Sequence, residues 1–167
     1  RLNWGNLESF NRTVIDPQAN RYMVVKDPVR LSLKGAPPAK PETFVHPDFP
    51  ERGKRRIPFD GKTVYISRED WKRFQNKTIR LKNLFNIKLS KRTATYSGDS
   101  IVQSMPKIQW VSFPARETEI LMPDRSLKAL AESTVKSLKK GDSLQMERIG
   151  YGRIDSKKPF TIIWIHA

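Results

Sequence analysis

The sequence has no cysteine and very little histidine. Without cysteine, the 167 residues can form neither a disulfide nor a thiolate metal site. The two histidines, His46 and His166, lie far apart in the chain and make no clustered metal-binding motif. These shortages exclude a disulfide-stapled domain and favour hydrogen-bonded or surface roles for both histidines.

Long apolar runs are missing as well. No stretch approaches the ~18 apolar residues that a membrane span requires, and the N-terminal segment from Arg1 to Trp4 lacks the apolar core of a signal peptide. The sequence therefore predicts a cytoplasmic protein without a membrane partner. Its first residue is Arg rather than Met, which favours a segment trimmed from a longer chain.

Acidic residues are few compared with basic ones. The chain has 32 Lys and Arg against 17 Asp and Glu, a net charge of +15. This surplus predicts a polyanionic partner, with nucleic acid as the first candidate, although a merely basic surface is also consistent with charge alone. The basic residues gather in three clusters: Arg52, Lys54, Arg55 and Arg56; Lys72, Arg73, Lys77, Arg80 and Lys82; Lys136, Lys139 and Lys140.

Motifs for catalysis are absent. The sequence has no glycine-rich nucleotide loop, no nucleophile elbow and no carboxylates clustered at a spacing suited to acid and base chemistry. It therefore predicts no active site, no metal and no cofactor in this segment. A basic surface interleaved with aromatic and amide side chains instead suits phosphate contacts and the reading or stacking of unpaired bases.

Short β-rich runs separated by Pro, Gly and Asp follow an N-terminal segment of roughly helical spacing. A capping Ser, early acids and late bases predict one helix from Ser67 to Phe74. A second candidate, from Ser126 to Lys140, stays undecided because Thr134 and Val135 weaken it. The predicted strands are Tyr22 to Val25, Val29 to Leu33, Thr63 to Ile66, Ile79 to Leu81, Phe85 to Leu89, Ile108 to Phe113, Glu119 to Met122, Ser143 to Glu147 and Phe160 to Ile165. This pattern is typical of a barrel or a sandwich.

Five ordered blocks of sequence resemble one protein family. The first, from Phe10 to Tyr22, is similar to the junction that follows the catalytic domain of archaeal and eukaryotic glutamyl-tRNA synthetases. The other blocks run from His46 to Arg56, from Arg80 to Asn86, from Lys107 to Val111 and from Gln145 to Asp155. On these blocks the chain is identified as a member of the class I glutamyl- and glutaminyl-tRNA synthetase family, over its C-terminal anticodon-binding region.

The resemblance implies a mainly β fold of two small β-barrels with few short helices, an anticodon-binding architecture shared with a ribosomal protein. It implies a junction helix over residues 1–20 that leads out of a missing catalytic domain. A proximal barrel would take residues 21–75 and 140–167, and a distal barrel would take residues 76–139.

The resemblance also implies which residues hold the middle anticodon base, a uridine. In the glutaminyl relative this base is bound by side chains that match Arg21, Gln145 and Arg148 in this sequence. A uracil edge offers two carbonyl acceptors and one N–H donor, which Arg donors and a Gln amide can satisfy together.

The two other anticodon bases are assigned in the same way. The wobble base is read by a motif that matches Ile79 to Lys82, with Arg80 and Lys82 at its two basic positions. Because Lys82 replaces an arginine, it keeps a phosphate contact but lacks the planar fork for base reading. The arginine that reads the third base falls near Lys72 or Arg73.

The amino-acid sequence of the first block and that of Leu84 to Asn86 favour the glutamyl branch of the family. The implied function is recognition of the tRNA(Glu) anticodon loop for a glutamate-tRNA ligase, with this segment non-catalytic and with ATP and Mg²⁺ bound in the missing catalytic domain. Three alternatives stay open: a glutaminyl-tRNA synthetase, a standalone ribosomal-RNA-binding barrel, and a module that binds partner proteins.

Overall fold

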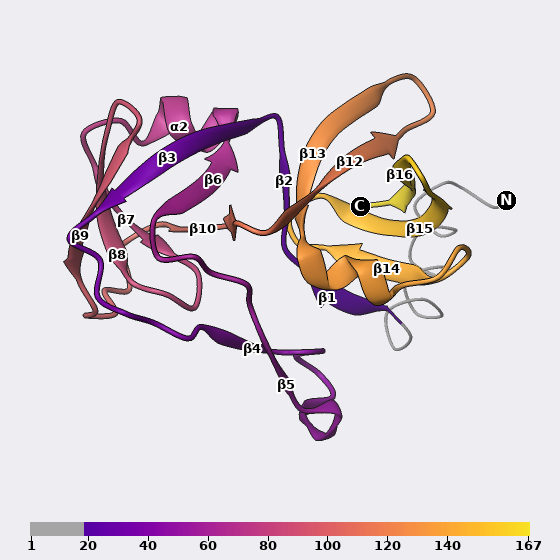
Figure 1. The fold of residues 1–167 in the computed structure, drawn as a ribbon, viewed down its shortest axis with the longest axis horizontal. Coiled ribbons are helices and arrows are strands. Elements are labelled where there is room, and N and C mark those ends of the chain that lie inside the picture. The colour runs from indigo at the N-terminus through magenta and orange to yellow at the C-terminus, as the bar shows by residue number, and fades with distance from the viewer. Residues whose placement is uncertain (1–18) are drawn as a thin grey trace, which may run out of the picture.

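A computed structural model describes residues 19–167, which are almost entirely β structure (Figure 1). Their strands form two seven-stranded, barrel-like sheets and one two-stranded hairpin. This confirms the prediction of a mainly β fold with two small barrels. The junction helix predicted for residues 1–20 lies, up to residue 18, outside the described residues.

We call the sheet built from residues 28–112 the central barrel. Its strands lie in the order β10-β7-β8-β9-β3-β6-β11. Side chains alternate between core and solvent, so Ile87 and Leu89 of β8 are fully buried while Lys88 and Ser90 are exposed. The strands are β3 (Pro28–Lys34), β6 (Thr63–Ser67), β7 (Thr78–Leu81), β8 (Asn86–Ser90), β9 (Thr93–Gly98), β10 (Lys107–Ile108) and β11 (Val111–Ser112).

We call the second sheet the terminal barrel, because it combines residues 20–26 with residues 115–166. Its strands lie in the order β1-β14-β15-β16-β12-β13-β2. Ile120, Leu144, Met146 and Ile162 belong to its separate apolar core. The strands are β1 (Asn20–Tyr22), β2 (Val24–Lys26), β12 (Ala115–Leu121), β13 (Ser126–Glu132), β14 (Ser143–Met146), β15 (Gly150–Lys157) and β16 (Phe160–His166).

The two barrels have the same strand topology. In the central barrel, β3 pairs antiparallel with β6 and parallel with β9, and β7, β8 and β9 form an antiparallel meander. In the terminal barrel, β12 pairs in the same two ways with β13 and β16, and β14, β15 and β16 form the meander. A short helix follows the second strand in each: α2 (Arg68–Arg73) after β6 and the 3₁₀ helix η2 (Ser133–Ser137) after β13.

One extended segment closes each barrel by pairing its two halves with opposite edges of the sheet. In the central barrel, β10 pairs parallel with β7 and β11 pairs antiparallel with β6. In the terminal barrel, β1 pairs parallel with β14 and β2 pairs antiparallel with β13. The closing segment follows the meander in the central barrel, but it comes from the opposite end of the described chain in the terminal barrel.

The predicted helix around residue 70 is confirmed. Its N-cap Ser67 accepts a hydrogen bond through Oγ from the Asp70 backbone N–H (3.1 Å). Glu69 and Asp70 lie in the first turn, and Lys72 and Arg73 lie in the last, as the helix dipole favours.

The undecided segment from Ser126 to Lys140 begins as a strand and continues as η2. Ala129 and Ala131 are buried while Ser126 and Lys128 are exposed, which is the alternation of a strand. Pairing with β12 on one side and β2 on the other overrides the helical propensity of Leu, Ala and Lys.

The strand pairing groups the chain differently from the predicted domain boundaries at residues 75 and 139. Strands β3 and β6 share a sheet with residues 78–112, and residues 115–132 share a sheet with residues 143–166. The reason is long-range pairing, because β3 is hydrogen-bonded to both β6 and β9.

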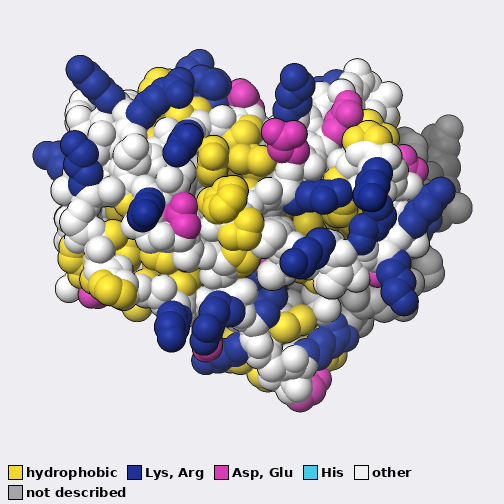
Figure 2. Space-filling model, in the orientation of Figure 1, with side chains coloured by type: hydrophobic (Ala, Val, Ile, Leu, Met, Phe, Trp, Pro, Cys, Tyr) yellow, Lys and Arg dark blue, Asp and Glu magenta, His cyan; other side chains and the backbone are white. Residues whose placement is uncertain are grey.

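A hairpin extends below the two barrels in Figure 1. It consists of β4 (Glu42–Phe44), the 3₁₀ helix η1 (Pro50–Arg52) and β5 (Lys54–Arg56), with β4 antiparallel to β5. Figure 2 shows Lys and Arg side chains over both barrels and around this hairpin. No helix in the described part of the chain is long and apolar enough to cross a membrane.

Candidate nucleic-acid interface

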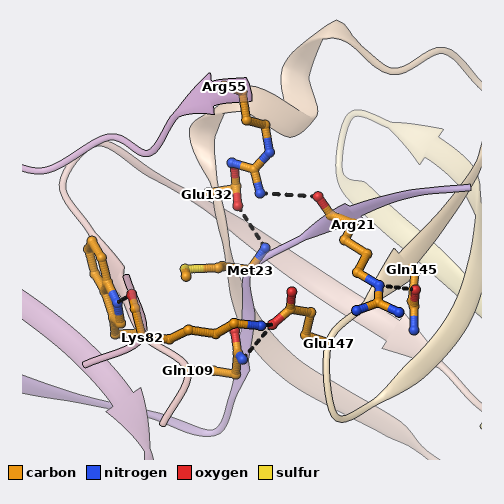
Figure 3. Close-up of polar contacts among 9 residues, drawn as sticks. Arg21, Met23, Arg55, Lys82, Gln109, Glu132, Gln145 and Glu147 are labelled. Carbon is orange, nitrogen blue, oxygen red and sulfur yellow. Dashed lines mark hydrogen bonds and ion pairs between the residues drawn. The ribbon is translucent and has the colours of Figure 1, made fainter. Parts of the chain in front are cut away.

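Two of the predicted site residues meet at the pairing of β1 with β14. Arg21 lies directly opposite Gln145 in this parallel pair, and its Nε donates to Gln145 Oε1 at 2.6 Å (Figure 3). The next pair along the strands, Tyr22 and Met146, is buried, so Arg21 and Gln145 lie on the outward side of the sheet. Among residues 19–167, neither the Arg21 Nη groups nor Gln145 Nε2 has a hydrogen-bond partner.

The hairpin fixes the backbone of Arg21. The Arg21 N–H donates to the Val45 carbonyl at 3.1 Å, and Arg55 Nη2 donates to the Arg21 carbonyl at 3.1 Å. The Arg55 guanidinium also lies over the Tyr22 ring, 5.3 Å from its centroid. These contacts hold the main chain of β1 against the hairpin, so the Arg21 side chain starts from a fixed position.

Arg55 is anchored in turn by Glu132, whose side chain is only 1% exposed. The Glu132 carboxylate pairs with Arg55 Nη1 and accepts from the Met23 backbone N–H (2.7 Å) and the Thr134 hydroxyl. Burial raises the pKa of the Glu132 carboxyl above its ordinary value, and the Arg55 charge and the three donors oppose that rise. Glu132 thus joins β13, η2, the hairpin and the residue between β1 and β2 at one buried point.

Arg148 lies in the turn that follows β14. Its φ is +66°, in the left-handed region that a non-glycine residue seldom adopts. Its Nη1 pairs with Asp70 Oδ2 at 2.9 Å, which ties the terminal barrel to helix α2 of the central barrel. The Asp70 side chain is 3% exposed and the Arg148 side chain is 49% exposed, so Arg148 covers a buried carboxylate from the solvent side.

A second bridge joins the barrels through Glu147. Its Oε2 accepts from Lys82 Nζ at 2.5 Å and from Gln109 Nε2 at 2.6 Å (Figure 3). Gln109, Glu147, Arg148 and Asp70 line a cleft of about 200 Å³. The structure therefore gives Lys82 an inter-barrel ion pair rather than a free charge.

The remaining predicted residues lie apart from the Arg21–Gln145 pair. Arg80 Nη1 donates to Asn86 Oδ1 (3.0 Å) and to the Asp99 carbonyl (3.2 Å). Lys72 and Arg73 are exposed on α2, with the Arg73 guanidinium 5.2 Å from the centroid of the Phe74 ring. The helix that carries them is the one that Arg148 contacts, but no described hydrogen bond joins Lys72 or Arg73 to the pair.

Sequence reasoning missed the side chains that hold this arrangement together. Glu147 and Gln109 lie inside blocks that carry the family resemblance, although nothing local in the sequence pairs them with Lys82. Asp70 is recognisable as an early helix acid, but its contact with Arg148 spans 78 residues. Glu132 gives no signal at all, since a glutamate in a polar segment is ordinarily exposed.

No cluster of three or more His, Asp or Glu in residues 19–167 could hold a metal ion. The described groups are hydrogen-bond donors, acceptors and cations. Such groups suit recognition of a polar or anionic partner.

Two family profiles, both described as the anticodon-binding domain of class I tRNA synthetases (E and Q), match residues 19–105 and 107–155. The chain is similar to a glutamate–tRNA ligase of Thermococcus kodakarensis, with 33% identity over 99% of the chain and 31% of the relative. It is also similar to glutamate–tRNA ligases of Methanoculleus marisnigri, with 35% identity over 93% and 28%, and Methanobrevibacter smithii, with 33% identity over 99% and 31%. The chain thus spans about a third of the length of these relatives.

Proposed function

The chain belongs to the family of anticodon-binding domains of class I tRNA synthetases for glutamate and glutamine, and on that premise we propose that it reads the anticodon loop of tRNA(Glu). Relatives named glutamate–tRNA ligase support the choice of the glutamate tRNA. The Arg21–Gln145 pair would hold the middle anticodon uridine, with Arg148 beside it.

The hydrogen bond between Arg21 and Gln145 carries this proposal, because it determines which polar groups of the pair remain available to a base. Gln145 uses its only acceptor atom on Arg21, which fixes the amide with its N–H₂ group still available. The pair therefore presents donors: Gln145 Nε2 and the two Arg21 Nη groups. Uracil presents two carbonyl acceptors to such donors.

The same donors discriminate against cytosine. Cytosine carries an exocyclic amino group in place of the uracil O4 and an unprotonated N3 in place of N3–H, so a donor placed to bind the uracil O4 would face another donor. An unmatched polar contact of this kind costs about 1 to 3 kcal/mol. The proposal thus predicts a preference for uridine that arises from the direction of hydrogen bonds.

The test is a titration of this chain against a glutamate tRNA and against the same tRNA with its middle anticodon uridine changed to cytidine. Both measurements use near-physiological salt, where non-specific phosphate binding is weak. A loss of about 1 kcal/mol or more for the cytidine tRNA is expected. Equal affinities would instead favour a basic scaffold, such as a standalone ribosomal-RNA-binding barrel.

The variant Gln145→Glu sharpens the test. A glutamate keeps an acceptor for Arg21 Nε but replaces the free N–H₂ donor with an oxygen, so the fold stays intact while uridine loses its partner. The matched control is Gln103→Glu, the same chemical change at an exposed residue before β10. We expect the uridine preference to fall in Gln145→Glu and to persist in the control.

The catalytic role belongs to the proposed whole enzyme rather than to this segment. We propose that the chain serves a cytoplasmic glutamate–tRNA ligase whose ATP- and Mg²⁺-dependent catalysis takes place in a domain outside it. The lengths of the relatives, of which the chain covers 31%, leave room for such a domain. A glutaminyl enzyme is the alternative within the family, and titration against a glutamine tRNA separates the two.

A further inference from the structure

The shared topology of the barrels gives each residue of the Arg21–Gln145 pair a counterpart in the central barrel. In each barrel the first half of the closing segment pairs parallel with the first strand of the meander. The register aligns Tyr22 and Met146 with Ile108 and Leu81, and all four side chains are buried. One residue earlier, Lys107 faces Arg80 as Arg21 faces Gln145.

The backbone after these strands confirms the alignment. Lys82 N–H donates to the Ile108 carbonyl at 3.1 Å, and Glu147 N–H donates to the Tyr22 carbonyl at 3.4 Å. The turns that follow also agree: Leu84 N–H donates to Leu81, and Ile149 N–H donates to Met146, both at 3.0 Å. In each turn the third residue has a positive φ, +60° at Asn83 and +66° at Arg148.

The side chains at these matching positions differ in charge. Gln145 is neutral and accepts from Arg21, so the pair in the terminal barrel is joined by a hydrogen bond and carries a single positive charge. Arg80 and Lys107 are both cations, and paired strands lie only about 4.8 Å apart. Like charges on directly opposite residues destabilise a sheet.

No ion pair in the described residues neutralises Arg80 or Lys107. Arg80 donates to an amide and to a backbone carbonyl, and no acidic side chain forms an ion pair with it or with Lys107. The nearby Asp99 carboxylate accepts from the Tyr96 hydroxyl at 2.8 Å. Lys107 is exposed and Arg80 is partly exposed, so an anion from solution can reach both.

We propose that Lys107 and Arg80 form a binding site for one phosphate of the tRNA anticodon strand. This inference rests on the proposed function, because it takes the Arg21–Gln145 pair to bind a base of the same strand. A phosphate between the two cations replaces their repulsion by two charge-assisted hydrogen bonds. Lys107 thereby adds affinity for the tRNA without distinguishing one base from another.

The test compares Lys107→Met with Lys158→Met. Lys158 is exposed in the turn after β15, at the far end of that strand from Gly150, which pairs with Met146. At ~3.3 Å per residue it lies roughly 25 Å along the strand from Gly150. Affinity for the glutamate tRNA is measured at several salt concentrations for wild type and both variants.

The expected result is a smaller salt dependence for Lys107→Met alone. The ratio of wild-type to Lys107→Met affinity should grow about fivefold for each tenfold dilution of salt, as one single-strand phosphate contact requires. The ratio for Lys158→Met should stay near one. Lys107→Arg should restore the wild-type salt slope, and Lys107→Met should keep the preference for the middle uridine.

Two outcomes would overturn the inference. One is a salt slope for Lys107→Met equal to that of wild type or of Lys158→Met. The other is a fall in the thermal stability of Lys107→Met, because removal of one of two repelling cations should leave stability unchanged or raised. Failure of the proposed function is distinct, since it appears in the wild type as equal affinity for the uridine and cytidine tRNAs.

Discussion

The central and terminal barrels share one topology but place different chemistry at matching positions. Where the central barrel has three cations, an asparagine and a serine, the terminal barrel has an amide, two acids and two arginines. The matching pairs, central residue first, are Arg80 and Gln145, Lys82 and Glu147, Asn83 and Arg148, Lys107 and Arg21, and Ser67 and Glu132.

Under the proposed function, the difference separates two modes of recognition. In the terminal barrel, side chains are fixed by hydrogen bonds to one another, and fixed donors can distinguish one base from another. In the central barrel, Lys107 and Arg80 face each other in the strand register without an ion pair, and the proposed phosphate would bind them whatever its base. Lys82 and Glu147 occupy matching positions, carry opposite charges and form an ion pair with each other. The two barrels therefore contact each other at this pair of matching positions.

The largest predicted effect is on stability, and it concerns the residue that immediately precedes the short helix of each barrel. Glu132 precedes η2 and holds three elements through a buried carboxylate, whereas Ser67 precedes α2 and makes one capping bond. Glu132→Ala should lower the free energy of unfolding by about 3 to 5 kcal/mol, because it leaves the mostly buried guanidinium of Arg55 without its carboxylate. Ser67→Ala should cost about 1 kcal/mol.

Urea unfolding of the two variants measures both losses. Equal losses would mean that Glu132 acts as a simple cap and that the barrels do not differ at this position. Arg55→Met is the companion variant, and it should cost less in a Glu132→Gln background than in wild type, because the two side chains act as one unit.

The second prediction exchanges the residue at the positive-φ position. Arg148→Asn gives the terminal barrel the residue that the central barrel has at Asn83, and Asn adopts the left-handed region more readily than Ala does. We expect the preference for the middle uridine to fall by about 1 to 3 kcal/mol, because the guanidinium is lost. Arg148→Asn should also be more stable than Arg148→Ala by about 1 kcal/mol.

Titrations of each variant with the uridine and cytidine tRNAs measure the uridine preference, and urea unfolding measures the difference in stability between Arg148→Asn and Arg148→Ala. Because both variants leave the buried Asp70 without Arg148, the comparison between them isolates the backbone. An unchanged uridine preference in Arg148→Asn would remove Arg148 from base reading and leave it as a cover for Asp70.

How far the sequence predicts this structure depends on the range of the contact. Helix α2 follows from local signals, since Ser67 and its first-turn acids lie within four residues of one another. The contact between Arg21 and Gln145 spans 124 residues, and only the parallel pairing of β1 with β14 creates it. Family resemblance named both residues, but no local pattern could supply their register.

The same limit explains the segment after residue 126 and the split of the chain into two sheets. Leu127, Ala129 and Ala131 favour a helix by propensity, yet they lie in a strand held from both sides. Pairing of β3 with β9 likewise brings residues 32–34 beside residues 93–95. Such pairings depend on the whole barrel rather than on the segment that forms them.

The smallest predicted effect is a pH dependence confined to the terminal barrel. Burial raises the pKa of Glu132 above its ordinary value of 4.5, so the folded protein binds this proton more tightly than the unfolded chain does. The stability that protonation of Glu132 contributes is fully present below pH 4.5 and is lost as pH rises through the raised folded pKa.

Glu132→Gln removes this titration, so the stability of wild type relative to the variant should fall as pH rises from 4 through the weakly acidic range. Urea unfolding of both proteins across that range measures the difference. The opposite slope would show that the charge of Arg55 outweighs burial and that Glu132 is held ionised, while Ser67→Ala, which removes no titratable group, serves as the flat control.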